Sequence, residues 1–546
     1  MSTNSKSNAK SQRITMPSGR KATVRGVTSI DGTNYVYVKY GKAEAYVQHG
    51  MFVGEKAEAR AHLKKQGVLV INDRDWATFI DAVDRIKAFG CKALVEQTGW
   101  TDPYFALRDG TVFGPPDVPK GIAIFPKVAA SNCVKGDLDE WRDLIAVPIA
   151  GQHLLMVAVL AALASPMVAI ASEKQNFGLE LSGPPEMGKT TWLNLFASTA
   201  FRPVGIPTFH STRTGQEDMF GEFRDMPFPV DETNLADPSD KQFVKDFAFR
   251  MANGVPKVTR NQPDRAQYRF VFGTTANEPI REALGKLNGD TSGAALQRLL
   301  PLRIDGSRAE GVFSFVPERF ANPGEFATHL TDAIESQYGT PMRRFLQELV
   351  IARAGNPDKL VARIRRKMSD FEDRVGVSGT ARGKTRATSA FGLLYAAGCF
   401  AKAKGILPES WDCLAACLAA YRNYQACLPD RTPLATRLLT IAQRTETLDI
   451  RDGAIPVLSN AQRDHHGAFI KMGKGGRVEL LLTDGVQRQF FPDWKPLKQT
   501  VDFKALNLSA KDHDGQQRQV RQGKTKERFI CFILPPDIVA QLSAKA

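Results

Sequence analysis

The sequence predicts an α/β fold built on a parallel sheet, because apolar strand patterns run into polar motifs at three places. Residues 177–181 alternate like a strand and lead into Gly183-Pro184-Pro185-Glu186-Met187-Gly188-Lys189-Thr190. Residues 226–230 end in adjacent acids, and residues 268–273 end in Thr274-Thr275-Ala276-Asn277. Since parallel sheets bind ligands outside the carboxyl ends of their strands, we expect the three motifs to form one site.

The first motif has the spacing G-x-x-x-x-G-K-[ST] of a phosphate-binding loop, and residues 191–200 follow it with helical spacing. Its glycines let backbone N–H groups wrap a polyphosphate, and the helix N-terminus adds a favourable dipole. We expect Lys189 to reach the β and γ phosphates of ATP and Thr190 to ligate Mg²⁺. The residues expected to bind the nucleotide are Gly183, Pro184, Pro185, Glu186, Met187, Gly188, Lys189, Thr190 and Thr191. The competing interpretation is a Gly/Pro turn before a helix.

The second motif supplies the carboxylates that nucleotide hydrolysis needs. We expect Asp231 to hold Mg²⁺ through water and Glu232 to polarise the attacking water. Pro227 and Pro229 cannot donate to a sheet ladder, so the strand before these acids is expected to be short or distorted. The alternative is that the two acids are only favourable charges at a helix start.

The third motif and a later arginine complete the predicted catalytic set. Asn277 is the candidate sensor of the γ-phosphate, although Asn also caps helices and turns. Arg298, or else Arg303, is the candidate arginine finger for the nucleotide of a neighbouring subunit, and either Arg is otherwise a solvated or structural charge. The order of these motifs is typical of AAA+ type ATPases, which implies a P-loop core with a parallel α/β sandwich.

The charge of the chain favours a polyanionic partner. Lys and Arg number 73 against 58 Asp and Glu, which gives a net charge of +15 and a pI near 9.4. The segment 254–265 reads as a basic hairpin or loop and carries Lys257, Arg260 and Arg265. We expect it to face the pore of a ring and to hold the phosphates of single-stranded DNA. The alternative is an ordinary exposed turn.

At 546 residues the chain is long enough for several domains. The α/β core at 146–324 is expected to be flanked by an N-terminal α+β domain, a helical lid and a small C-terminal α+β domain similar to a winged helix. The expected boundaries are 1–13 for a disordered basic tail, then 14–145, 146–324, 325–433 and 434–546.

Two flanking domains have patterns of their own. In the N-terminal domain, residues 22–47 predict a β meander, and residues 55–66 and 73–89 predict helices. In the C-terminal domain a helix should come first. The short strands expected after it lie around Phe469, Leu480 and Phe490 and at residues 529–534.

The chain predicts neither a membrane span nor a structural zinc site. Residues 154–171 are almost continuously apolar, but the Ala-rich run contains Ser165 and Pro166 and is expected to be a buried helix. Seven cysteines show no C-x-x-C pair, and Cys413 and Cys417 fit a helix core, which favours a reduced cytoplasm. The first residues lack the apolar stretch of a signal peptide.

The chain resembles the phage and plasmid helicase-like family known as domain of unknown function 927. The resemblance extends over most of residues 20–535. It rests on Gly99-Trp100, Gly136-Asp137-Leu138-Asp139-Glu140-Trp141, residues 161–167, the phosphate loop, Met251-Ala252-Asn253-Gly254, and residues 326–345 with Tyr338-Gly339. Pro184 and Pro185 depart from the Gly or Ser that the family commonly has after the first glycine of the loop. The resemblance implies a ring-forming DNA motor related to AAA+ or superfamily 3 helicases, here without a primase part.

The leading hypothesis is therefore an ATP-dependent DNA helicase or translocase that replicates a phage, plasmid or other mobile element. We expect a homo-hexamer that threads single-stranded DNA and works with replication proteins such as a separate primase. One alternative is an ATP-dependent loader or remodeller of another protein. Another is an origin-binding initiator that uses ATP as an assembly switch, with residues 436–546 as the only candidate for base reading.

Overall fold

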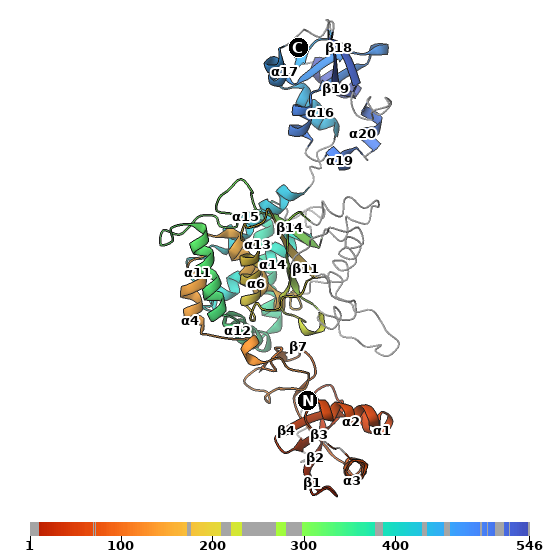
Figure 1. Ribbon diagram of the computed structural model, residues 1–546, viewed down its shortest axis with the longest axis vertical. Coiled ribbons are helices and arrows are strands. Elements are labelled where there is room, and N and C mark those ends of the chain that lie inside the picture. The colour runs from red at the N-terminus through yellow and green to blue at the C-terminus, as the bar shows by residue number, and fades with distance from the viewer. Residues whose placement is uncertain are drawn as a thin grey trace. The chain divides into compact units, whose positions relative to one another are not determined.

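The computed structural model describes residues 10–68, 70, 72–171, 176–208, 220–231, 269–279, 298–376, 386–428, 434–451, 459–491, 494–498, 501–507, 518–522 and 525–543. The chain divides into two compact units, residues 1–427 and 428–546. Figure 1 labels several helices and strands of each unit.

The first unit begins with a small, mainly antiparallel sheet, which confirms the predicted meander. Its strands are β1 Gln12–Thr15, β2 Lys21–Thr28, β3 Asn34–Tyr40 and β4 Ala43–Gln48, and β5 Phe89–Cys91 adds to β2 in parallel. The helices of this part are α1 His49–Gly54, α2 Lys56–Lys65 and α3 Asp73–Asp84. The helix expected over 73–89 is thus wrong at its end, because residues 89–91 pair with β2.

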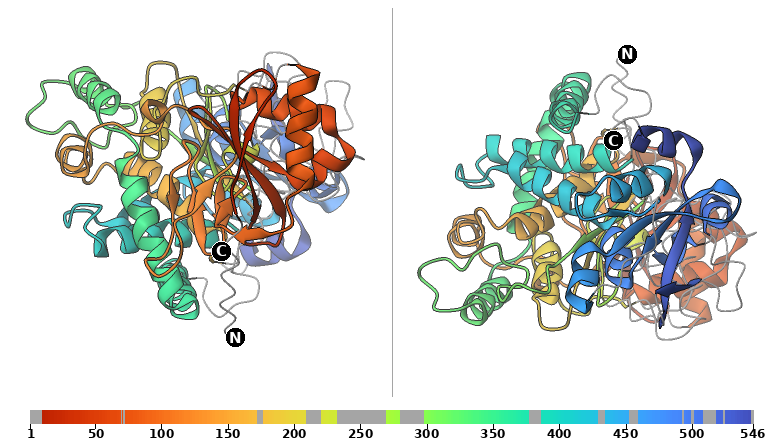
Figure 2. Two further views of the ribbon diagram at one scale, coloured as in Figure 1. Left: turned by 90° about the horizontal axis from the view of Figure 1, so that it is seen from below. Right: turned by 90° about the horizontal axis from the view of Figure 1, so that it is seen from above.

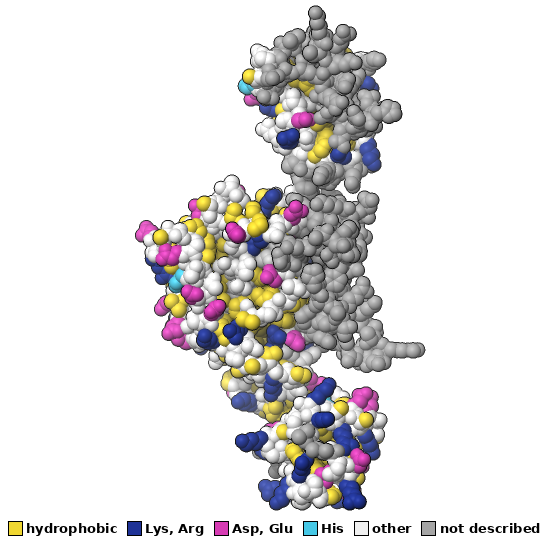
Figure 3. All heavy atoms as spheres, viewed as in Figure 1, with side chains coloured by type: hydrophobic (Ala, Val, Ile, Leu, Met, Phe, Trp, Pro, Cys, Tyr) yellow, Lys and Arg dark blue, Asp and Glu magenta, His cyan; other side chains and the backbone are white. Residues whose placement is uncertain are grey.

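Helices α1 to α3 cover one face of this sheet (Figure 2). Phe52, Leu63 and Phe79 of these helices pack into a core with valines of the strands. The face that Figure 3 draws carries many Lys and Arg side chains on this part of the chain. Such a surface is suited to a polyanion.

Short strands and turns connect this sheet to the centre of the unit. They are β6 Leu94–Val95, β7 Gly99–Thr101, β8 Tyr104–Ala106, β9 Val112–Phe113 and β10 Ile122–Ala123, as expected for the residues after Gly99. Helix α4 Leu138–Trp141 follows and passes directly into a π-helical turn, η2 Arg142–Ala146. Asp137 caps α4 by accepting hydrogen bonds from two backbone N–H groups.

The central sheet is parallel and has the strand order β12-β13-β11-β14. The strands are β11 Phe177–Ser182, β12 Phe228–Val230, β13 Val271–Ala276 and β14 Leu299–Arg303. The strand predicted over 177–181 is confirmed, and β12 is short, as its prolines indicated. The strand predicted over 268–273 is displaced: β13 begins at Val271 and includes Thr274 to Ala276, so that Asn277 follows it directly.

Helix α5 His153–Ala164 lies at the centre of the core and confirms the buried helix predicted from the apolar run. A 3-10 turn, η3 Ser165–Met167, follows it, and α6 Lys189–Ser198 packs against α5, β12 and β13. Within the described residues, no helix combines the length and the apolarity that a membrane crossing requires.

The remainder of the first unit is helical, as predicted. Its helices are α11 Pro323–Ser336, α12 Thr340–Gly355, α13 Pro357–Arg374, α14 Arg386–Ala403 and α15 Cys413–Cys427. Helices α14 and α15 pack on α5, and α15 also packs on β14. Cys413 and Cys417 are buried on α15, which confirms their predicted place in the core.

The second unit is a small α+β domain. Its sheet has the order β15-β16-β17-β19-β18, with β15 Leu448–Asp449, β16 Ala468–Met472, β17 Val478–Leu482, β18 Arg518–Gln522 and β19 Thr525–Ile533. Its helices are α16 Leu434–Ala442, α17 Asn460–His466, η4 Lys474–Gly476, α18 Asp484–Phe490, α19 Trp494–Leu497, α20 Val501–Leu506 and α21 Pro536–Ser543. The strand predicted around Phe490 is wrong, because this residue ends α18, whose Val486 packs into the domain core. The likeness to a winged helix stays a prediction.

Candidate functional site

The phosphate-loop motif forms a tight turn between β11 and α6. Gly188 is the N-cap of α6 and has a left-handed backbone with φ of 81°. A Cβ atom there would lie 2.6 Å from Val312 Cγ1, so only glycine fits. Glu186 also has a positive φ of 63°. Pro184, Glu186 and the first-turn residue Thr190 are exposed, so the N-terminus of α6 is open to an anion.

Lys189 is half-buried and lies across this loop. Its Nζ donates to the carbonyl oxygen of Gly183 at 2.9 Å and to that of Pro184 at 2.5 Å. These two backbone contacts hold the ammonium group over the loop. A phosphate bound there would compete for the same ammonium group.

Asp231 follows β12 and lies at the same edge of the sheet. Its Oδ1 accepts a hydrogen bond from Thr275 Oγ1 at 2.9 Å, and its N–H donates to the Pro207 carbonyl at 2.9 Å. Thr275 pairs in register with Leu181, near the end of β11. The side chain of Asp231 therefore points toward β13, which lies directly beside the strand that leads into the loop.

Asn277 also lies at this edge, because it follows the last residue of β13. The preceding residue, Ala276, pairs with Ser182, and its carbonyl accepts from the Gly183 N–H at 3.2 Å. The structure thus brings Lys189, Thr190, Asp231 and Asn277 to the carboxyl edge. Glu232, Lys257, Arg260 and Arg265 lie outside the described residues.

The two candidate arginines lie at opposite edges of the sheet. Arg298 precedes β14, and its carbonyl accepts from Gly178 N–H at the amino end of β11. Its side chain is buried, and this burial, followed by the nearby charge of Arg386, lowers its pKa. Arg303 pairs with Ser182 at the carboxyl edge and is exposed, with its backbone held by the Asn423 side chain at 2.8 Å.

A segment after β14, residues 304–315, lies against the phosphate loop; we call it the strap. Val312 N–H donates to the Met187 carbonyl at 2.9 Å, and Ile304 N–H donates to the Ser182 carbonyl at 2.8 Å. A Cβ atom on Gly311 would lie 2.7 Å from Met187 O. Sequence reasoning missed this segment, because it has no motif and its contacts depend on where β14 lies.

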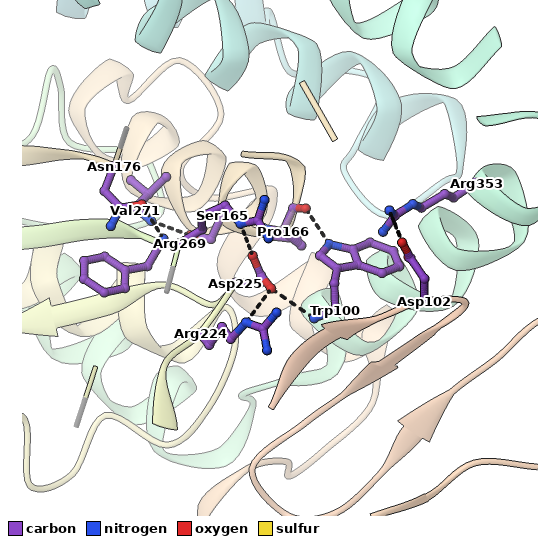
Figure 4. A network of polar contacts seen from close by, with 11 residues as sticks. Trp100, Asp102, Ser165, Pro166, Asn176, Arg224, Asp225, Arg269, Val271 and Arg353 are labelled. Carbon is purple, nitrogen blue, oxygen red and sulfur yellow. Dashed lines mark hydrogen bonds and ion pairs between the residues drawn. The ribbon is translucent and has the colours of Figure 1, made fainter. Parts of the chain in front are cut away.

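The amino edge holds a buried network around Asp225 (Figure 4). This carboxylate is fully buried and accepts from the Trp100 N–H at 3.0 Å. Arg224 Nε and Arg269 Nε lie 3.7 and 3.6 Å from its two oxygens. Burial raises the pKa of Asp225, although the charges of Arg224 and Arg269 oppose the shift.

The same network explains the Gly99-Trp100 motif. Gly99 has a φ of 78°, and a Cβ atom there would lie 2.6 Å from Asp225 Oδ2. The Trp100 indole donates to the Pro166 carbonyl at 2.9 Å, and the Arg353 guanidinium lies 4.3 Å from the indole ring while it pairs with Asp102 at 2.9 Å. These contacts join β7 to the core and have a structural role.

The residues at the carboxyl edge fit a nucleotide with Mg²⁺. A hydroxyl on Thr190, a carboxylate on Asp231 and an ammonium on Lys189 are the donor types that hold a metal–triphosphate group. Across the described residues, no cluster of three or more His, Cys, Asp or Glu side chains forms a metal site of protein ligands alone. A cavity of about 330 Å³ between Arg108, Arg202 and Phe223 contains no residue of the phosphate loop in its wall.

Comparisons with known proteins agree with this fold. No curated protein sequence matches the chain. A solved structure described as "SCCmec type IV Cch - active helicase" has a TM-score of 0.59, is 14% identical, and the match covers 97% of each chain. A second, "The A form apo structure of NrS-1 C terminal region-CTR", is 11% identical over 66% of this chain and 79% of that chain. Its TM-score of 0.28 is too low to support an inference. The first match shows that the chain has the fold of that helicase structure.

The family prediction is tested by the sequence model of one family. Residues 34–268 match the family described as "Domain of unknown function (DUF927)". This range contains Gly99-Trp100, the acidic motif around Trp141 and the phosphate loop, which carried the resemblance. The resemblance is confirmed over this range, because residues 34–268 match the sequence model of the DUF927 family.

Proposed function

We propose that the chain is an ATP-dependent DNA helicase or translocase of a phage, plasmid or other mobile element. The observation that carries this proposal is the convergence of Lys189, Thr190, Asp231 and Asn277 on the carboxyl edge of one parallel sheet. In open parallel sheets this edge is where ligands bind. An AAA+-like P-loop core accounts for a phosphate loop, a carboxylate and a polar amide in this arrangement.

Each residue has a distinct part in the proposed hydrolysis. The loop N–H groups and Lys189 hold the phosphates of ATP, while Thr190 and Asp231 hold Mg²⁺, which neutralises charge on the phosphates. Thr275 orients the Asp231 carboxylate through its 2.9 Å hydrogen bond. Glu232 polarises the attacking water and Asn277 orients it. Arg303 is the better placed of the two arginines to reach a neighbouring subunit, because it is exposed whereas Arg298 is buried.

The proposed substrate is single-stranded DNA, threaded through a homo-hexameric ring in the cytoplasm. The helicase fold of the full-length structural match and the net charge of +15 support a nucleic-acid partner. Lys257, Arg260 and Arg265 remain the proposed contacts to the phosphates. A separate primase and other replication proteins are further proposed partners.

ATP hydrolysis with and without single-stranded DNA tests the proposal. We expect strong stimulation by DNA in the wild-type chain, no hydrolysis in Glu232→Gln, and hydrolysis without stimulation in Lys257→Ala. Hydrolysis that ignores DNA in the wild-type chain would favour an ATP-dependent loader or an origin-binding initiator instead. Absence of hydrolysis under all conditions would remove the ATPase proposal.

The ring and its arginine finger can be tested by mixing variants. Lys189→Ala and Arg303→Ala protomers are each expected to be inactive alone, and their mixture should regain part of the activity at hybrid interfaces. The same mixture with Arg298→Ala serves as the comparison, because Arg298 lies buried at the other edge of the sheet. If activity recovers only in the mixture of Lys189→Ala with Arg298→Ala, Arg298 and not Arg303 is the arginine finger.

A further inference from the structure

The strap, residues 304–315, contacts the phosphate loop at several positions along its length. A Cβ atom on Gly183 would lie 3.0 Å from Ile304, one on Gly306 would lie 2.9 Å from the ring of Pro184, and one on Gly188 would lie 2.6 Å from Val312. Glycines occur on both sides of these contacts. The two backbones therefore approach more closely than side chains would allow.

The hydrogen bond from Val312 to Met187 fixes the orientation of one peptide group in the loop. The Met187 carbonyl points at the strap, where it accepts from Val312 N–H at 2.9 Å. In a trans peptide the carbonyl and the following N–H point in opposite directions, so the N–H of Gly188 is turned away from the strap. Phosphate loops bind their anion through backbone N–H groups, so the orientation of this peptide matters for binding.

Gln152 holds the far end of the strap in place. Its side chain is fully buried, its Oε1 accepts from Ser314 N–H at 2.6 Å, and its Nε2 donates to the Phe315 carbonyl at 2.7 Å. An amide side chain can make both bonds at once, because its oxygen accepts and its nitrogen donates. Arg308 closes the turn of the strap by donating to the carbonyls of Phe313 and Ser314 at 3.2 and 2.8 Å.

We propose that Gln152 is a positioning residue of the nucleotide site, which acts by fixing the strap against the phosphate loop. Without Gln152 the strap loses its attachment to the start of α5, and the Met187 carbonyl loses a rigid partner. The Met187–Gly188 peptide is then free to rotate, and nucleotide binding has to restore its orientation. This inference rests on the proposed nucleotide site and adds a residue to it that touches neither the nucleotide nor the metal.

The test is the affinity of the full chain for a fluorescent ATP analogue with Mg²⁺, together with the kinetics of ATP hydrolysis. Gln152→Ala should weaken binding and raise KM by about tenfold, because two buried hydrogen bonds no longer preorganise the loop. The kcat at saturating ATP should stay within about twofold, as expected when uniform binding is lost. Gln152→Glu keeps the acceptor for Ser314 N–H but loses the donor to the Phe315 carbonyl. Its affinity for ATP is expected to lie between those of the wild type and Gln152→Ala.

A matched control separates positioning from loss of stability. Gln337 is also buried and also uses both ends of its amide, since it accepts from Asp137 N–H at 3.0 Å and donates to Glu140 at 2.5 Å. Gln337→Ala should lower the melting temperature much as Gln152→Ala does but leave ATP affinity unchanged. Equal affinity in both variants and the wild type overturns the inference, and so does an equal loss in both variants.

A second pair of variants tests the strap without touching Gln152. Gly311 and Gly41 both have a φ of 60°, but an added Cβ meets Met187 O at 2.7 Å in the first and nothing within 4 Å in the second. Gly311→Ala should weaken ATP binding, whereas Gly41→Ala should cost only stability. If Gly311→Ala binds ATP normally, the strap does not position the loop. If the wild-type chain fails to bind ATP, both the proposed function and this inference are wrong. If the wild-type chain binds ATP and Gln152→Ala binds it equally well, only the inference is wrong.

Discussion

The two edges of the central sheet use polar residues in opposite ways. At the carboxyl edge, Lys189 and Asp231 are half-buried and Thr190 is exposed. At the amino edge, Asp225 is fully buried and surrounded by guanidinium groups and the Trp100 N–H. Polar groups that remain accessible are available to a ligand, while polar groups that are buried must be satisfied by the protein itself. Burial therefore separates the proposed site from the network that supports it.

The largest effect is expected at the amino edge. Asp225→Ala leaves Arg224 and Arg269 close together without their counter-charge, and guanidinium groups do not lose their proton. We expect a loss of about 3–5 kcal/mol in the free energy of unfolding, measured in urea. Asp305→Ala is the control, because this exposed aspartate only caps a turn by accepting from Ser307, and its change should be about 1 kcal/mol or less. If both variants lost the same free energy of unfolding, burial would not distinguish the two edges of the sheet.

The opposite behaviour is expected at the carboxyl edge. Lys189→Ala should lower kcat/KM for ATP hydrolysis by about a hundredfold or more, because a charge aimed at the phosphates is lost. The melting temperature without nucleotide should change little, because Lys189 is only half-buried and its ammonium group donates to two carbonyls of the loop itself. A variant that hydrolyses ATP normally would contradict the assignment of this edge as the site.

A smaller effect is expected from the group that orients Asp231. Thr275→Val removes the hydroxyl that donates to Asp231 at 2.9 Å and should lower kcat by about tenfold while raising the Mg²⁺ concentration needed for half-maximal activity. Thr274→Val is the matched control: Thr274 is buried on the same strand, and its hydroxyl finds no hydrogen-bond partner in the described part of the chain. The orienting role of Thr275 would be refuted if both variants had the same Mg²⁺ dependence.

The smallest effect is expected for the indole of the amino-edge network. Trp100→Phe keeps an aromatic ring against Arg353 but loses the hydrogen bond to the Pro166 carbonyl. Unfolding in urea should show a loss of about 1 kcal/mol, and the KM for ATP should not change. A change in KM would show that the two edges are coupled, which would weaken the contrast drawn between them.

Local sequence patterns predicted the elements of the core well. The alternation at residues 177–181, the loop spacing and the apolar run before it appear in the structure as β11, the turn into α6, and α5. Errors occurred where a segment pairs with a distant one. Residues 89–91 leave the predicted helix to join β2, and Thr274 to Ala276 extend β13 because β11 pairs along its whole length.

The candidate site was predictable in part for the same reason. Lys189, Asp231 and Asn277 each follow a recognisable strand, so their common edge could be inferred from the parallel sheet. The strap and Gln152 carry no motif, and their partners are more than a hundred residues away in the chain. The positions of Arg298 and Arg303 relative to the site likewise depended on the register of β14 with β11.

The sequence by itself determined the phosphate loop, the acids and amide that follow the strands, and the apolar helix at the centre. These features depend on spacing and periodicity among neighbouring residues, which a single chain displays directly. Only the tertiary structure decided the strand order, the burial of Asp225 and the closure of the strap on Met187. Such contacts join segments far apart in the chain, and their geometry follows from packing and strand register, which no local pattern specifies.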